Sequence, residues 1–143
     1  MLYESDVKQV GLDKEIEYLN NYIELQKMRV RGDVSISFSI NGDMSGNVIE
    51  PMLLIPFIEN AFKHGINYST KAEVIIDLNL LGNMLFLKVE NDINSTKEKD
   101  KASGIGLNNV RRRLNLLYPG NHALKIEQTI DKYIVKLEIS LKK

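Results

Sequence analysis

Hydrophobic residues recur at alternating steps of four and three positions between Leu12 and Val30. This spacing places them on one side of a helix, so the segment is predicted to form an amphipathic helix. The segment VSISFSI, residues 34–40, instead alternates strictly between apolar residues and serines. Such alternation is typical of a strand with one buried face.

Two pairs of alternating segments predict two β-hairpins. Residues 73–91 contain two alternating runs that are separated by Gly82-Asn83, and residues 123–141 contain two more on either side of Asp131-Lys132. Glycine, asparagine and aspartate at these points favour tight turns. We therefore expect five amphipathic strands, of which one lies in residues 34–40 and four lie in the hairpins.

A second helix is predicted around residues 51–65. Pro51 suits the first turn of a helix, and Gly65 suits the position just past its end. Pro56 is harder to place, because a proline inside a helix removes a hydrogen bond. Regular helix should therefore start near Leu53, or the segment should bend at Pro56.

A third helix is predicted in GIGLNNVRRRLNLLYPG, residues 104–120, and Pro119-Gly120 should end it. Its apolar stripe consists of Leu107, Val110, Leu114 and Leu117. The arginines at 111–113 suit a charged helix face, although one of them could reach a phosphate or the first helix. Residues 92–103 are rich in charge and poor in apolar side chains, so we expect a mobile loop there. Three helices and five strands imply an α+β fold, a two-layer sandwich with one sheet covered on one face.

Composition excludes several classes of function. Basic and acidic residues balance at 19 each, so no net field attracts nucleic acid, and no nucleic-acid partner is expected. The lack of cysteine excludes a disulfide framework, a thiolate metal site and a cysteine nucleophile. The longest apolar run, PMLLIPF, is far shorter than the roughly 20 residues that a membrane helix needs. With 143 residues, the chain is expected to form one domain.

Two stretches combine residue types that could bind a ligand. In PFIENAFKHG, residues 56–65, helical spacing places Glu59, Asn60, Lys63 and His64 on the side opposite the apolar residues. Taken alone, this spacing favours an ordinary solvated face over a binding site. In SGIGLNN, two glycines open the third predicted helix, where free N–H groups and the helix dipole can hold phosphate. The alternative there is a simple turn from loop to helix.

Three segments together resemble a known family. PMLLIPFIENAFKHGI, GIGLNNVRRRLNLLYP and LDKEIEYLNNYIELQKMRVRG are similar to the ATP-binding catalytic part of LytS-like sensor histidine kinases. Those domains belong to the superfamily shared with DNA gyrase and MutL (GHKL). The resemblance runs from about Leu12 to the C-terminus, and it implies a Bergerat-type fold with a mixed sheet of about five strands beneath three helices.

The resemblance implies a site for ATP and Mg²⁺. In such domains, the asparagine at the position of Asn60 ligates the magnesium ion that bridges the phosphates, and Lys63 and His64 lie beside the phosphate chain. A magnesium ion takes oxygen ligands and keeps several waters, so one amide oxygen plus phosphate oxygens is adequate. The remaining nucleotide contacts are implied at Gly104, Ile105, Gly106 and Leu107.

The chain departs from the family at the adenine contact. Relatives carry an aspartate followed two positions later by a glycine, and here these positions hold Asn91 and Ile93. The Asn91 oxygen can still accept a hydrogen bond, although an uncharged acceptor is weaker than a carboxylate. Asp92 is the substitute if the register shifts by one, and Asn91 is otherwise a strand-end residue that starts a turn.

The catalytic groups also depart from the family. ATP-hydrolysing relatives carry a glutamate four residues before the magnesium asparagine, where this chain has Pro56. Glu59 could polarise a nucleophile instead, although it points about 100° away from Asn60. The phosphoacceptor motif is missing, and neither His64 nor His122 is expected to replace it. The chain alone should therefore bind ATP but lack its phosphorylation target.

These observations lead to one expected function and two alternatives. The expected function is the catalytic domain of a bacterial two-component sensor kinase, with residues 1–31 linking it to a dimerisation and phosphoacceptor region and residues 32–143 forming the ATP-binding domain. The full-length protein would be a homodimer that phosphorylates a response regulator, cytoplasmic at this domain and tethered to the inner membrane. The alternatives are an anti-sigma-factor-type serine kinase and a non-catalytic interaction module of the same fold.

Overall fold

The structure is a computed structural model that describes residues 9–30, 34–65, 72–92 and 97–141. For residues 64–65 and 97–106, the description covers the backbone alone. Ile93, which stands where relatives carry a glycine near the adenine contact, lies outside the described residues.

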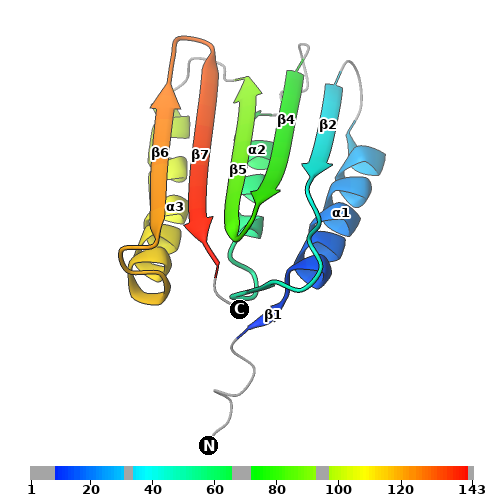
Figure 1. The fold of residues 1–143 in the computed structure, drawn as a ribbon. Helices are drawn as coiled ribbons and strands as arrows, with labels where there is room; N and C mark the ends of the chain where they lie inside the picture. The colour runs from blue at the N-terminus through cyan, green and yellow to red at the C-terminus, as the bar shows by residue number, and fades with distance from the viewer. Residues whose placement is uncertain (1–8, 31–33, 66–71, 93–96, 142–143) are drawn as a thin grey trace, which may run out of the picture.

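A mixed five-stranded sheet forms one layer of the molecule, with strand order β2-β4-β5-β7-β6 (Figure 1). Strand β2 pairs in parallel with β4, and the other neighbours pair antiparallel. The strands are β2 (Val34–Asn41), β4 (Ala72–Leu81), β5 (Met84–Asp92), β6 (His122–Gln128) and β7 (Lys132–Ser140). Both predicted hairpins and the predicted strand at 34–40 are confirmed.

Three helices form the second layer, on one face of the sheet (Figure 1). They are α1 (Leu12–Arg29), α2 (Ile55–Gly65) and α3 (Lys97–Leu117). Helix α2 packs against β4, β5 and α3. The expected two-layer α+β sandwich is therefore confirmed. The apolar stripe of α1 is buried, with Leu12, Leu19 and Ile23 fully enclosed, so this stripe packs into the core of the domain.

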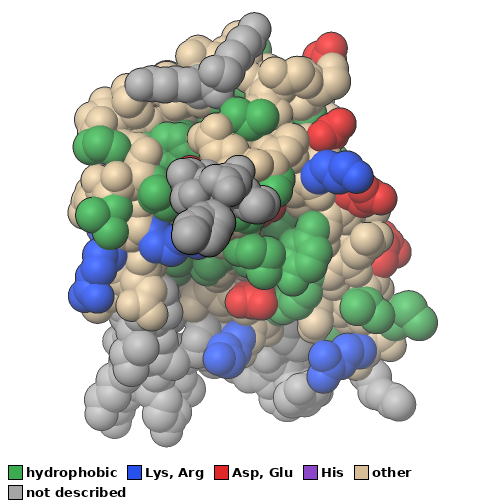
Figure 2. All heavy atoms as spheres, turned by 90° about the horizontal axis from the view of Figure 1, so that it is seen from below, with side chains coloured by type: hydrophobic (Ala, Val, Ile, Leu, Met, Phe, Trp, Pro, Cys, Tyr) green, Lys and Arg blue, Asp and Glu red, His purple; other side chains and the backbone are tan. Residues whose placement is uncertain are grey.

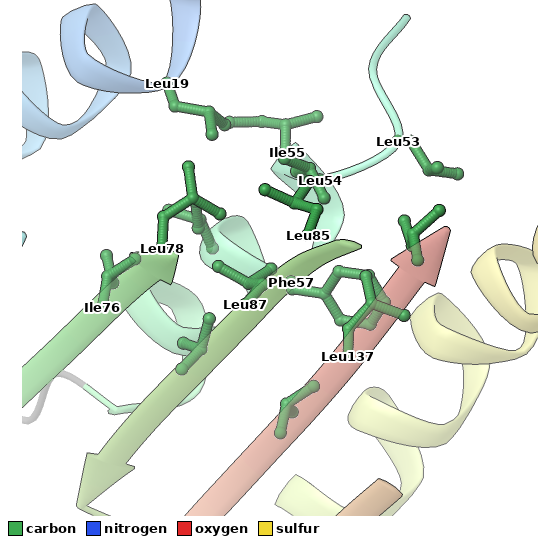
Figure 3. Close-up of a cluster of buried hydrophobic side chains, with 14 of the residues drawn as sticks. Leu19, Leu53, Leu54, Ile55, Phe57, Ile76, Leu78, Leu85, Leu87 and Leu137 are labelled. Carbon is green, nitrogen blue, oxygen red and sulfur yellow. The ribbon is translucent and has the colours of Figure 1, made fainter. Parts of the chain in front are cut away.

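The core lies between the two layers. Figure 3 shows Phe57 of α2 directed at Leu87 and Leu137 of the sheet, and Ile55 directed at Leu19 of α1. All five of these side chains are buried. Burying one such side chain contributes about 1.5–3 kcal/mol, so this contact surface fixes α2 on the sheet.

A second, small sheet was not predicted. Strand β1 (Val10–Gly11) pairs antiparallel with β3 (Val48–Ile49), and the N–H of Leu12 donates to the carbonyl of Asn47 at 2.8 Å. The chain that enters α1 is therefore attached to the segment that leads into α2.

The start of α2 differs from the expectation for Pro51. Helix α2 begins at Ile55, and Pro51 lies in the turn before it. Pro56, instead, occupies the first turn, where the missing N–H has no intrahelical partner to lose. Gly65 is the last residue of the helix and not the residue after it.

Helix α3 is longer than predicted. It begins at Lys97, so residues 97–103, which were expected in a mobile loop, are helical. Lysine, glutamate and alanine dominate this stretch and favour helix, and extending an existing helix costs little. Leu117 was also placed wrongly in the apolar stripe, because it is 40% exposed while Tyr118 is buried in its place.

Candidate nucleotide site

Three polar residues of PFIENAFKHG, Glu59, Asn60 and Lys63, lie on the outer side of α2. Phe57 and Ala61 are each 1% exposed and face the sheet. Glu59 and Lys63 are exposed, and Asn60 is half-buried. The predicted division of this helix into an apolar and a polar side is therefore confirmed.

The two flanks of α2 face different helices. On one flank, the Phe62 ring meets the Tyr22 ring of α1 edge-on, with centroids 5.9 Å apart and planes at 74°. At 100° per residue, Asn60 lies about 160° around the helix from Phe62. Because α2 lies between α1 and α3 in the helical layer (Figure 1), Asn60 is on the flank that faces α3.

Glu59 lies on the flank that faces α1. It is about 60° around the helix from Phe62 on the wheel. Burial raises the pKa of the Tyr22 phenol, and the nearby Glu59 carboxylate raises it further. Glu59 and Asn60 are thus adjacent in sequence but directed to opposite neighbours. A role for Glu59 in activating a nucleophile beside Asn60 stays a prediction.

Asn91 and Asp92 lie on opposite faces of the sheet. Asn91 continues the buried alternation of β5 on the helix-covered face, and its side chain is 2% exposed. Its amide nitrogen donates to the backbone carbonyl of Asp92 at 2.9 Å. This hydrogen bond orients the amide, so the buried side chain is fixed under the helical layer.

The Asp92 carboxylate is held by other groups on the open face. One oxygen accepts a hydrogen bond from the N–H of Glu73 at 2.9 Å, and the other contacts the Lys132 ammonium at 2.5 Å. The Asp92 contact is also the main cause of the raised pKa of Lys132. Asn91, not Asp92, therefore shares a face of the sheet with Asn60 and its helix.

The remaining predicted contacts come from two helices. Lys63 and His64 lie in the last turn of α2. Gly104, Ile105 and Gly106 lie within α3, seven or more residues after its first residue, and not at its N-terminus. Leu107 follows them and is buried in the core. The predicted use of free N–H groups at a helix start does not apply at these glycines.

The described residues offer few groups for a metal. No group of three or more histidine, cysteine, aspartate or glutamate side chains within this part of the chain could hold an ion. Asn60 supplies one amide oxygen on the α3 flank. This donor set fits a magnesium ion that takes most of its oxygens from phosphate and water.

The sequence analysis missed Glu15 of α1. Its side chain is only 4% exposed, and one carboxylate oxygen accepts a hydrogen bond from the N–H of Met52 at 3.3 Å. The available signal was a carboxylate three residues after Leu12, on the apolar side of the predicted helix. A charge in that place is rarely buried without partners.

Comparison with solved structures defines the class of fold. The catalytic domain of the histidine kinase ThkA matches with a TM-score of 0.61 at 15% identity, over 92% of this chain and 94% of that chain. Full-length ShkA, solved in complex with AMPPNP, matches with a TM-score of 0.67 at 14% identity, over 94% of this chain and 31% of that chain. The fold is that of a histidine kinase catalytic domain.

Comparison with curated proteins finds sensor kinases among the relatives of this chain. The sensor histidine kinase BtsS of Escherichia coli K12 is 28% identical over 125 residues, which are 87% of this chain and 22% of that protein. The sensor protein LytS of Oceanobacillus iheyensis is 27% identical over 135 residues, which are 84% of this chain and 23% of that protein. No protein-family model matches the chain.

The chain is therefore homologous to LytS-type and other sensor histidine kinases, and the predicted resemblance is confirmed. It spans less than a quarter of the length of the curated relatives it matches. Within the described ranges, no helix is both long and apolar enough to cross a membrane.

Proposed function

We propose that this chain is the ATP-binding catalytic domain of a bacterial sensor histidine kinase and binds ATP together with Mg²⁺. Its homology to sensor histidine kinases and its histidine kinase fold support the class. The main observation that supports the proposed site is the position of Asn60, which is half-buried on the flank of α2 that faces α3. A single amide in that place has the donor chemistry that a phosphate-bound magnesium ion accepts.

Each group around Asn60 has a proposed role. Asn60 would hold Mg²⁺, which neutralises charge on the phosphates when it is bound. Lys63 and His64, in the last turn of α2, would contact the phosphate chain, with Lys63 acting as a point charge. On α3, the backbone of residues 104–107 would approach the nucleotide closely, because two glycines there carry no side chain.

Asn91 is the better candidate for the adenine contact. It is buried on the helix-covered face at the end of β5, whereas the Asp92 carboxylate is bonded to Glu73 and Lys132 on the other face. A neutral acceptor binds an amino group more weakly than a carboxylate does. We therefore expect the affinity for adenine to be modest.

The proposed reaction transfers the γ-phosphoryl group to a histidine that this chain does not supply. The contribution of the domain would be positioning and charge neutralisation, which account for most of the catalysis in phosphoryl transfer. In the full-length protein, a phosphoacceptor region, a homodimer and a membrane tether would complete the kinase, and a separate response regulator would receive the phosphoryl group. Residues 1–31 would link this domain to that region.

Isothermal titration of the chain with ATP tests the site. We expect binding in MgCl₂ and a loss of about tenfold or more in Asn60→Ala, which corresponds to about 1.4 kcal/mol. Asn20→Ala, which removes an exposed amide from α1, is the matched control and should leave the affinity unchanged. Asn91→Ala should weaken ATP and ADP equally, because it acts at the base and not at the phosphates.

The same titration separates the alternatives. A non-catalytic module would give no heat at millimolar nucleotide and no thermal stabilisation. A Mg-ATP affinity that Asn60→Ala leaves intact would contradict the proposed site. Supplying the phosphoacceptor region in trans distinguishes a histidine kinase from a serine kinase, because phosphohistidine is lost in acid and phosphoserine is not.

A further inference from the structure

A short turn connects β3 to α2, and side chains from two other helices form hydrogen bonds with it. The turn comprises residues 50–54, and it ends where α2 begins at Ile55. Glu15 of α1 and Arg113 of α3 both bond to its backbone. Figure 2 shows the end of the molecule where α2 begins, with hydrophobic side chains gathered across the surface and charged ones around them.

Glu15 binds the N–H side of this turn. One oxygen of its carboxylate accepts from the N–H of Met52 at 3.3 Å, and among the described residues the other oxygen is buried without a hydrogen-bond partner. Met52 lies three residues before the first residue of α2. A buried carboxylate from α1 therefore binds the backbone of the turn that leads into the helix that carries Asn60.

Arg113 binds the carbonyl side of the same turn. Its guanidinium donates to the carbonyl of Met52 at 3.1 Å and to the carbonyl of Pro51 at 3.0 Å. Tyr118, near the end of α3, accepts from the N–H of Glu50 at 3.1 Å. The turn is thus fixed from both sides by helices that flank α2.

The backbone of the turn adopts a conformation that its residues do not favour. Met52 has φ of +61°, which is in the left-handed region. That conformation costs about 1–2 kcal/mol in a residue other than glycine. Surrounding contacts must over-determine such a conformation for it to persist, and Glu15 and Arg113 provide these contacts.

We propose that Glu15 is a positioning residue for the Mg-ATP site, acting through the 50–54 turn on the orientation of α2. This inference rests on the proposed function. Asn60 lies six residues after Leu54, about 9 Å along the helix at 1.5 Å per residue. Within that distance α2 is a rigid rod, so a change at the turn moves the amide of Asn60. A metal ligand tolerates little displacement.

A double-mutant cycle on the chain tests this inference, with Mg-ATP affinity as the readout. Glu15→Ala should weaken Mg-ATP by about tenfold, and it should have little further effect in the Asn60→Ala background. The reason is that no metal ligand remains to be positioned. Glu15→Gln keeps an acceptor oxygen for the N–H of Met52 and should restore most of the affinity.

A matched control separates positioning from general destabilisation. Ile126→Ala removes a partly buried side chain from β6, at the sheet edge beneath α3, and should lower thermal stability without changing affinity. The inference would be overturned if Glu15→Ala reduced Mg-ATP affinity equally in the unaltered and the Asn60→Ala backgrounds. It would also be overturned if Ile126→Ala reduced that affinity as much as Glu15→Ala does. If Glu15→Ala does not fold, Arg113→Ala disturbs the same turn from the other side and enters the same cycle.

The two proposals fail in different ways. If the unaltered chain binds no Mg-ATP, the proposed function is rejected and this inference falls with it. If the unaltered chain binds Mg-ATP and Glu15→Ala binds it equally well, only the positioning role is rejected.

Discussion

The two ends of α2 are built differently. At its N-terminal end, buried or half-buried side chains from α1 and α3 hold the turn that precedes it. At its C-terminal end, Lys63 projects into solvent. Between these ends, Asn60 is half-buried on the flank that faces α3. The N-terminal end is fixed by contacts within the domain, whereas the described side chain at the C-terminal end, Lys63, is exposed.

This contrast suggests that the N-terminal end of α2 positions the helix and that its C-terminal half carries the groups proposed to bind the ligand. A side chain that holds a metal must be kept in place. The contacts at the N-terminal end of α2 support the half-buried Asn60 in this way. Apolar packing of Phe57 on the sheet provides the second attachment point, midway between the turn and the polar end.

The largest predicted effect comes from removing that attachment. Phe57→Ala should lower the free energy of unfolding by about 3–5 kcal/mol, because a buried aromatic side chain leaves a cavity. Urea denaturation measures the change. Phe86→Ala is the control, since Phe86 lies half-buried on the open face of β5. If the two variants lost equal stability, α2 would not depend on Phe57 for its position.

A smaller effect is expected from Arg113. Arg113→Ala should cost about 1–3 kcal/mol, because it leaves the carbonyls of Pro51 and Met52 without their charged donor. Arg112→Ala, which removes an exposed neighbour on the same helix, should stay within about 0.5 kcal/mol of the unaltered chain. Thermal and urea unfolding of both variants would show whether the turn before α2 depends on Arg113.

Much of this architecture follows from the sequence. Strict alternation placed the five strands, and continuing the alternation of Leu85, Leu87 and Val89 puts Asn91 on the buried face. Helical spacing also separates Glu59 from Asn60 around α2. Which neighbour each flank meets depends on the order of the helices in their layer, and spacing within one helix carries no information about that order.

Other features could not be predicted from local pattern. Strands β1 and β3 have two residues each, too few for alternation to reveal. The left-handed backbone at position 52 could not be predicted, because the residue there is methionine and not glycine or asparagine. Contacts from Glu15 and Arg113 hold this conformation. The first residues of α3 have little apolar content to indicate a helix, and their helicity follows from the helix propensity of lysine, glutamate and alanine.

A dependence on pH should distinguish Glu15 from other carboxylates. Burial raises the pKa of Glu15 above its ordinary value of about 4.5, although backbone hydrogen bonds and Arg113 partly counteract this. The folded state then binds the proton more tightly than the unfolded state does. Stability from this group is present at low pH and is lost as pH rises from about 4.5 through the raised value.

Glu15→Gln removes this titration, so its stability relative to the unaltered chain should rise with pH across that window. The slope cannot exceed about 1.4 kcal/mol per pH unit for one group. Urea unfolding at a series of pH values measures it, with Glu17→Gln, an exposed glutamate of α1, as the control. A difference that falls as pH rises would mean that the hydrogen bonds at the turn outweigh burial.

The smallest predicted effect concerns the strain in the turn. Met52 is 46% exposed, so its side chain contributes little packing, while its φ of +61° favours glycine. Met52→Gly should therefore be more stable than Met52→Ala by about 1 kcal/mol, the reverse of the order expected in a helix. Chemical denaturation of the two variants measures the difference. Equal stability would show that Glu15 and Arg113 do not hold the turn in its left-handed conformation in solution, and the contrast between the ends of α2 would then lose its structural basis.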